Sequence, residues 1–106
     1  MKHTLKGITK RTEQGGFEVY LDGRYLSPKR SQKVYNHSPD GFTWGYCGSG
    51  PTQLALAICL ELLGKEEAMA RYQNFKRNFI GGLPQGQDFE IEFELGLDIQ
   101  EGSGLI

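Results

Sequence analysis

Residues 51–63 read Pro-Thr-Gln-Leu-Ala-Leu-Ala-Ile-Cys-Leu-Glu-Leu-Leu, and this stretch decides the fold. Proline suits the first turn of a helix, because its missing N–H has no partner there and its φ is already helical. From Leu54 onward the stretch carries one charge, on Glu61. A helix that is apolar on nearly every side must be enclosed by the rest of the domain. We therefore expect a buried central helix that begins at Pro51 and ends at Gly64.

A second helix is expected immediately afterwards, over Lys65 to Ile80. Its apolar residues recur at i, i+4, i+7 and i+11, which places them in one stripe along the helix: Ala68, Tyr72, Phe75 and Phe79. Gly81 and Gly82, followed by Pro84, are typical of a helix end. The two helices together predict a helical hairpin.

Strands are expected on both sides of this helix pair. Residues 17–21 alternate apolar and polar residues, and the following Asp22-Gly23 supplies the positive φ angles of a type I′ turn. Residues 24–26 then return as the second arm of a hairpin. Residues 5–10 are expected to form the first strand, with Gly7 as a possible bulge.

The basic run after the hairpin is harder to assign. Pro28 ends the hairpin, and we expect residues 29–33 to form a solvated loop, followed by a short strand over 33–36. Residues 37–41, His-Ser-Pro-Asp-Gly, have turn chemistry throughout.

The clearest strand spans residues 88–95. Apolar residues that should face inward alternate with glutamates that should face water: Phe89, Ile91, Phe93 and Leu95 against Glu90, Glu92 and Glu94. Residues 81–106 carry six acidic and no basic residues, whereas residues 1–35 net +5 from eight basic and three acidic ones. Opposite charges paired across strands stabilise a sheet. We expect the acidic and basic strands to share one sheet, and a charged patch for a partner is the alternative.

These elements predict an α+β fold, with a small antiparallel or mixed β-sheet packed against a two-helix hairpin. The 106 residues are enough for a single domain, which we expect to span 1–106 with a frayed tail over about 99–106.

Composition excludes several functional classes. The net charge of −1 predicts no general affinity for nucleic acid. The longest apolar run is too short to span a bilayer, the basic N-terminal segment lacks the apolar core of a signal peptide, and two isolated cysteines suit a reducing compartment. We expect a cytoplasmic protein with no membrane partner and no cofactor.

The segment 44–53, Trp-Gly-Tyr-Cys-Gly-Ser-Gly-Pro-Thr-Gln, is the candidate ligand site. A glycine-rich turn ahead of a helix presents backbone N–H groups and the positive end of the helix dipole, which together bind phosphate or carboxylate. The P-loop pattern fails because Pro51 replaces its lysine, and the dinucleotide pattern fails because Gln53 replaces its third glycine. The alternative is that the segment only starts the helix. The candidate ligand-binding residues are Trp44, Tyr46, Cys47, Gly48, Ser49, Gly50 and His37.

Each of these side chains also has a structural interpretation. Trp44 and Tyr46 could stack on a ring or pack in the core. Cys47 or Ser49 could be a nucleophile with His37 as its base, which would make a small Cys- or Ser-dependent enzyme, but the sequence supplies no acidic residue to orient the base. We therefore assign no catalytic residue.

The remaining cysteine and histidines predict no further site. Cys59 is most simply a small core residue. His3, His37, Cys47 and Cys59 lack the spacing of a metal site, so no metal is expected.

A nucleic-acid interface is the other alternative. Basic residues coat the second helix away from its apolar stripe, as in a recognition helix, although ordinary solvated helices have the same pattern. The residues concerned are Arg71, Lys76 and Arg77.

The run from Asn36 to Gln53 resembles a family of small bacterial, archaeal and phage proteins of unknown function. The shared core reads His-Ser-Pro, Gly-Phe, Trp-Gly-Tyr, Gly-Ser-Gly-Pro and Gln-Leu-Ala-Leu-Ala in order, and the likeness continues through Phe75-Lys76 and Leu83-Pro84 to cover roughly residues 17–95. Cys47 and Thr52 depart from that pattern, which argues against an essential thiol.

The resemblance implies an accessory role in phages or mobile elements and brings no known activity. Together with the residues above, it favours a non-enzymatic binding or regulatory module, whose partner is a small anionic ligand or another protein.

Overall fold

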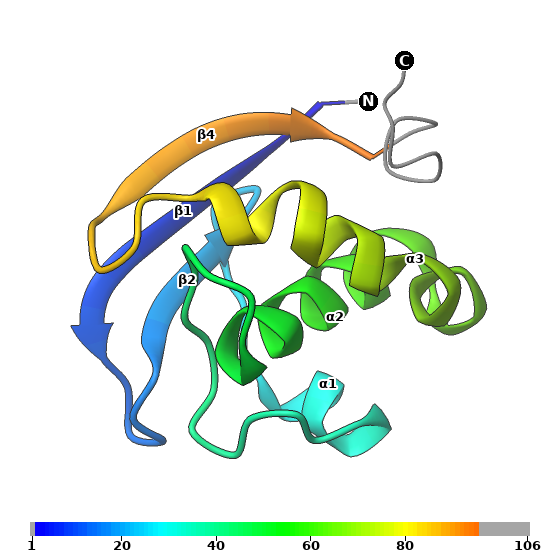
Figure 1. Ribbon diagram of the computed structural model, residues 1–106, viewed down its shortest axis with the longest axis horizontal. Coiled ribbons are helices and arrows are strands. Elements are labelled where there is room, and N and C mark those ends of the chain that lie inside the picture. The colour runs from blue at the N-terminus through cyan, green and yellow to red at the C-terminus, as the bar shows by residue number, and fades with distance from the viewer. Residues whose placement is uncertain (1, 96–106) are drawn as a thin grey trace.

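The structure is a computed structural model that describes residues 2–95 (Figure 1). Within this range the elements follow in the order β1 Lys2–Arg11, β2 Phe17–Leu21, β3 Arg24–Tyr25, α1 Lys29–Val34, α2 Ser49–Leu63, α3 Lys65–Asn78, the 3-10 helix η1 Ile80–Gly82, and β4 Phe89–Glu94. The tail in which we expect fraying, 99–106, lies outside the described residues.

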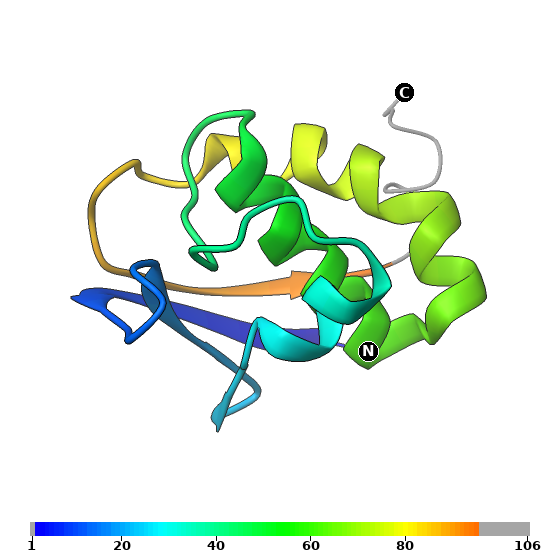
Figure 2. The same ribbon diagram turned by 90° about the horizontal axis from the view of Figure 1, so that it is seen from below.

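The central helix α2 is enclosed, as its composition predicts. Eleven consecutive residues, Gly50–Leu60, are buried. Figure 2 shows the sheet as one layer and the helices as a second layer on one of its faces. Burying a large aliphatic side chain stabilises a fold by about 1.5–3 kcal/mol. The leucines and isoleucine of α2 therefore contribute a large share of the hydrophobic stabilisation.

The strands form one antiparallel sheet in the order β3-β2-β1-β4. The hairpin between β2 and β3 turns at Asp22 and Gly23, whose φ angles of 54° and 81° confirm the expected turn chemistry. Together with the helices, this sheet confirms the α+β class expected from the sequence.

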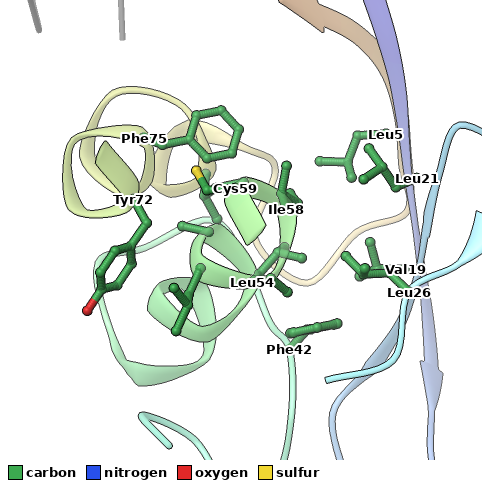
Figure 3. Close-up of a cluster of buried hydrophobic side chains, with 14 of the residues drawn as sticks. Leu5, Val19, Leu21, Leu26, Phe42, Leu54, Ile58, Cys59, Tyr72 and Phe75 are labelled. Carbon is green, nitrogen blue, oxygen red and sulfur yellow. The ribbon is translucent and has the colours of Figure 1, made fainter. Parts of the chain in front are cut away.

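Figure 3 shows how the two layers meet in the core. Leu5, Val19 and Leu21 extend from the sheet toward Leu54 and Ile58 on α2. On the far side of α2, the expected stripe of α3 completes the core: Ala68, Tyr72 and Phe75 are buried, and Phe79 is partly buried. Cys59 on α2 lies beside Phe75 of α3 (Figure 3) and is fully buried, and this burial raises the pKa of its thiol to about 12, as suits a core residue.

The acidic strand β4 pairs with the basic strand β1, which confirms the expectation from the charge split. Lys2 lies opposite Glu94 and Lys6 opposite Glu90 in the register. The Nζ of Lys2 also lies 3.8 Å from a carboxylate oxygen of Glu92 on the diagonal. These charged side chains occupy the sheet face away from the helices, where they are exposed to water.

The basic run after the hairpin was wrongly expected to be a loop and a short strand. It forms α1, which begins after Pro28, and the carbonyl of Pro28 accepts the N–H of Gln32 and the hydroxyl of Ser31. Because lysine, arginine and glutamine have good helix propensity, the run folds as a helix once proline has fixed its first turn.

Two smaller expectations are also wrong. The helix α2 begins at Ser49 and not at Pro51, because Gly48 already takes the extended conformation of the residue before a helix. Gly7 is not a bulge, since it pairs in register with Val19 and Phe89, and the irregularity lies between Ile8 and Arg11.

The lack of a side chain at Gly7 has a packing cause. A Cβ there would lie 2.4 Å from the ring of Phe89 and 2.7 Å from the ring of Trp44. These two rings meet edge to face over the glycine, with centroids 4.9 Å apart. The ring of Trp44 therefore packs directly against the backbone at Gly7.

Two aspartates fasten neighbouring segments to β1. One oxygen of Asp22 accepts the N–H of Thr4 at 2.9 Å, and the other lies 2.8 Å from Nδ1 of His3. Asp88 accepts both the N–H and the hydroxyl of Thr9 at 2.7 Å. The backbone hydrogen bond is the main reason why the pKa of each carboxyl lies below its usual value, and the His3 and Thr9 side chains add to the effect.

A buried glutamine fixes the chain between α1 and α2. The side chain of Gln53 is fully buried, and its oxygen accepts the N–H groups of His37 at 2.7 Å and Ser38 at 2.8 Å. Its nitrogen donates to the hydroxyl of Ser31 at 2.9 Å and to the carbonyl of Tyr35 at 3.1 Å. One side chain therefore makes four hydrogen bonds, which join α1, the segment that follows it and α2.

Acid should destabilise the protein through the two fastening aspartates. Because their folded pKa values lie below the unfolded ones, the stability they supply is complete above the unfolded pKa and is lost as the pH falls through the folded values. The variants Asp22→Asn and Asp88→Asn should each show a shallower fall of unfolding free energy with acid. Urea denaturation at a series of pH values measures this slope, and slopes equal to the wild-type one contradict the prediction.

Replacing Gln53 with leucine should be among the most damaging single changes. It removes four hydrogen bonds at a buried site, each worth about 0.5–1.5 kcal/mol, so we expect a total loss of about 3–5 kcal/mol. The neighbouring buried change Thr52→Ser keeps its hydroxyl and should cost much less. Chemical denaturation of both variants provides the comparison, and a loss below about 1 kcal/mol for Gln53→Leu would show that the loop is held by other contacts.

Candidate functional site

A polar hollow of about 150 Å³ lies at the N-terminal end of α2. Four parts of the chain form its walls: the end of β1, the β1–β2 turn, the segment before α2 and the first residues of α2. The lining residues are Arg11, Gly15, Gly16, Ser38, Asp40, Gly41, Thr43, Tyr46, Ser49 and Gly50.

Backbone hydrogen bonds bring these distant segments together. The N–H of Gly16 donates to the carbonyl of Asp40 at 2.7 Å, and the N–H of Phe17 donates to the carbonyl of Phe42 at 2.8 Å. These bonds hold the segment before α2 against the start of β2. Gln53 anchors the same segment from the other side through the N–H of Ser38.

The first turn of α2 contributes one wall of the hollow. Within residues 2–95, the backbone N–H groups of Ser49 and Gly50 have no protein acceptor, as is usual for the first residues of a helix. Gly50 is buried against Thr43, whose hydroxyl would lie 1.9 Å from a Cβ at that position. Glycine is therefore required there for the helix to approach the preceding segment.

Hydroxyl groups complete the same wall. The side chains of Thr43 and Tyr46 share a hydrogen bond of 2.8 Å. Tyr46 remains 41% exposed, so its ring forms the rim of the hollow. The wall therefore offers both donors and acceptors to a small polar molecule.

One cation and one anion line the hollow. The guanidinium of Arg11 donates to the carbonyl of Gly15 at 2.6 Å and lies 4.5 Å from the centre of the Phe17 ring. These two contacts fix the end of the arginine side chain. Asp40 supplies the opposing negative charge. The positive end of the α2 dipole adds to the arginine, so the field at this point favours an anion that also carries a hydrogen-bond donor for Asp40.

Only some of the candidate ligand-binding residues proposed from the sequence line the hollow. Tyr46, Ser49 and Gly50 line the hollow. Trp44 does not, because it is 1% exposed and its indole N–H donates to the carbonyls of Pro84 at 3.0 Å and Gln87 at 3.1 Å. It is a core residue that joins the loop before β4 to the sheet.

Gly48 and Cys47 lie beside the hollow and do not line it. Gly48 precedes α2 in an extended conformation, and the ring of Tyr46 covers the position where its side chain would be. Cys47 is exposed, and its sulfur lies close to Gly81 in η1.

His37 belongs to a different cluster. Its ring stacks on Tyr35 with centroids 4.3 Å apart, and its Nε2 lies 2.9 Å from the hydroxyl of Tyr72 on α3. Burial, assisted by the charge of Lys76, holds the pKa of His37 below its usual value. Within residues 2–95 no hydrogen bond joins His37 to Cys47 or Ser49, the two candidate nucleophiles.

The basic residues of α3 have different neighbours. Arg71 makes an ion pair with Glu67 at 3.1 Å, one turn earlier on the helix. Arg77 donates to the side-chain oxygen of Asn74. Lys76 lies near His37, as its effect on the histidine shows. Two of the three residues proposed for nucleic acid are thus engaged by their own helix.

Sequence reasoning missed most of the hollow. Arg11 is about thirty residues of sequence away from Asp40 and Thr43, and it meets them through the pairing of residues 16–17 with 40–42. The turn chemistry of residues 37–41 was a signal for a tight bend, but nothing in the sequence indicates which strand that bend contacts.

Two further observations limit the kinds of site in the described part of the chain. Among residues 2–95, no group of three or more His, Cys, Asp or Glu side chains is placed to hold a metal ion. No helix in the same range has the length and apolar character needed to cross a membrane.

Comparison with known proteins gives a family without an activity. Neither a curated protein nor a solved structure matches the chain. A family model described as a family of unknown function, DUF6166, matches residues 7–98, which include the hollow and both layers of the core. The chain therefore belongs to the DUF6166 family.

Proposed function

We propose that the protein is a non-catalytic binding module that takes a small anionic ligand in the hollow at the start of α2. The observation that carries the proposal is the presence of Arg11 in the same hollow as the N–H groups of Ser49 and Gly50. A helix start alone is weakly attractive to anions, and a guanidinium adds a full charge with several fixed donors.

The hollow also defines the size and chemistry of the ligand. A volume of about 150 Å³ admits a group the size of a phosphate or carboxylate and little more. Because Trp44 is buried, Tyr46 is the one aromatic residue among the lining side chains, and it lies at the rim. Asp40 favours ligands that donate a hydrogen bond, such as a protonated phosphate, and weakens the binding of fully ionised anions.

A non-catalytic role agrees with the placement of the nucleophile candidates. His37 is engaged by Tyr35 and Tyr72, away from the lining of the hollow. Ser49 lines the hollow, but no histidine does. An activated hydroxyl needs a base bonded to it, and within residues 2–95 no hydrogen bond joins Ser49 to Asp40, the carboxylate that lines the hollow.

The cellular setting is part of the same proposal. Both cysteines are free thiols, which suits the cytoplasm. The single-domain organisation and an origin in phages or mobile elements rest on chain length and on the resemblance of residues 36–53 to such proteins.

Inorganic phosphate is the probe that tests the proposal. It should raise the melting temperature in a concentration-dependent way, as any ligand that binds only the folded state does. Arg11→Gln should abolish the rise. Asp40→Asn should tighten binding about fivefold, equivalent to ~1 kcal/mol for removing one like charge at a partly exposed site.

The matched control for Arg11→Gln is Lys10→Gln, which removes the same charge from the neighbouring exposed residue. This variant should keep the response to phosphate. A rise in melting temperature that survives in Arg11→Gln, or that disappears equally in Lys10→Gln, would refute a defined site in the hollow.

A further inference from the structure

Strand β4 lies at an edge of the sheet. The strand order puts β1 on one side of β4, and within residues 2–95 no strand pairs with its other side (Figure 1). An edge strand presents a row of backbone N–H and C=O groups that can accept another strand. At six residues, Phe89–Glu94, this edge is long enough to pair with a typical strand.

The side chains of β4 make the two faces of this edge chemically different. On the face away from the helices, Glu90, Glu92 and Glu94 are all exposed. On the helix face, Phe89 and Phe93 are buried, and Ile91 between them remains partly exposed. Phe79, also partly exposed, packs on Phe93 with ring centroids 5.2 Å apart. The edge therefore offers an acidic row on one side and a partly covered apolar row on the other.

The acidic row is only partly neutralised by its own sheet. β1 places two lysines, Lys2 and Lys6, opposite the three glutamates, since Thr4 lies opposite Glu92. The one ion pair within range joins Lys2 to Glu92, with both side chains about two-thirds exposed at 69% and 68%. Within residues 2–95, Glu90 and Glu94 have no ion-pair partner, so the row keeps negative charge for an incoming strand.

The same charges select among possible partners. A second copy of β4 laid against this edge would bring glutamates next to glutamates, and like charges on neighbouring strands destabilise pairing. A strand that alternates lysine or arginine with apolar residues would place its cations beside the glutamates and its apolar side chains beside Ile91. β1 itself shows this pattern on the opposite edge, where Lys6 faces Glu90 and Leu5 faces Ile91.

We infer that the outer edge of β4 is a docking site for an extended, basic segment of a partner protein, which joins the sheet as a fifth strand. Backbone hydrogen bonds supply part of the affinity, and the alternation of cationic and apolar side chains supplies the specificity. This interaction is independent of the hollow at the start of α2, because it uses none of the residues that line it.

A labelled peptide of about eight residues, in which lysine alternates with valine, is a suitable probe. Fluorescence anisotropy should show saturable binding that weakens as salt is added. A peptide with glutamate in place of lysine should not bind. A third peptide keeps every lysine but has proline in place of the central valine, and it should also fail, because proline removes a donor and cannot enter a strand interior.

Two protein variants of equal charge locate the site. Glu90→Gln with Glu94→Gln removes two charges from the edge, and we expect binding to weaken about tenfold. Glu13→Gln with Glu66→Gln removes two exposed charges elsewhere and should leave binding within about twofold of wild type. Amide hydrogen exchange should show new protection of residues 89–94 when the lysine–valine peptide is bound.

Three results would overturn the inference. The first is an absence of binding to the lysine–valine peptide at low salt. The second is equal binding of the proline-containing peptide, which would indicate a loose electrostatic contact without strand pairing. The third is equal weakening in the two double variants, which would mean that net charge and not the β4 edge attracts the peptide.

Discussion

The rest of the structure depends on the burial of α2 on all sides. Eleven consecutive buried residues, Gly50–Leu60, cannot be covered by one neighbour, because a helix turns its surface through every direction within four residues. The sheet covers one side, α3 covers another, and α1 with the chain that follows it covers a third. This requirement explains why the sheet, two other helices and a long connecting segment all pack around a single helix in a chain of 106 residues.

Covering a helix with irregular chain brings polar backbone into the core. The loop between α1 and α2 must pass over the buried face of α2, where its N–H and carbonyl groups lose contact with water, and such groups are costly when unpaired. Gln53, placed on that face, pairs with this loop at Tyr35, His37 and Ser38. The polar Gln53 thus occurs in the otherwise apolar α2 because this side of the helix is covered by a loop with polar backbone groups.

The sequence was most informative where a pattern is local. The apolar run of α2, the stripe of α3, the Asp22-Gly23 turn and the alternation in β4 each depend on residues within one element, and each prediction was confirmed. The basic run 29–34 misled because its charges suit water in a loop and in an exposed helix equally well. Its helical state depends on Pro28 and on a packing position against α2.

The hollow could not be predicted, because its charges arrive from different segments. Arg11 belongs to the end of β1 and Asp40 to a turn, and only the hydrogen bonds between residues 16–17 and 40–42 bring them beside α2. Trp44 was a candidate ligand contact for the opposite reason: its local sequence, an aromatic residue in a glycine-rich run, is typical of a ligand site, although the residue is buried in the core. Its burial follows from Gly7, a glycine 37 positions away, whose missing side chain makes room for the indole ring. Local patterns therefore predicted the elements, and the long-range pairings that create the site left no local signature.

The one-sided covering of the sheet also explains its surface charges. Because all the helices lie on one face, every second residue of each strand faces away from them and is free to be polar (Figure 2). Lysines on the interior strand β1 have neighbours on both sides, with Tyr20 and Glu90 flanking Lys6. Glutamates on β4 have a neighbour strand on one side only, so their negative charge acts mainly on whatever approaches the edge. Placing the acidic strand at the edge and the basic strand inside thus gives the lysines of β1 acidic neighbours and opposes the pairing of two identical edges.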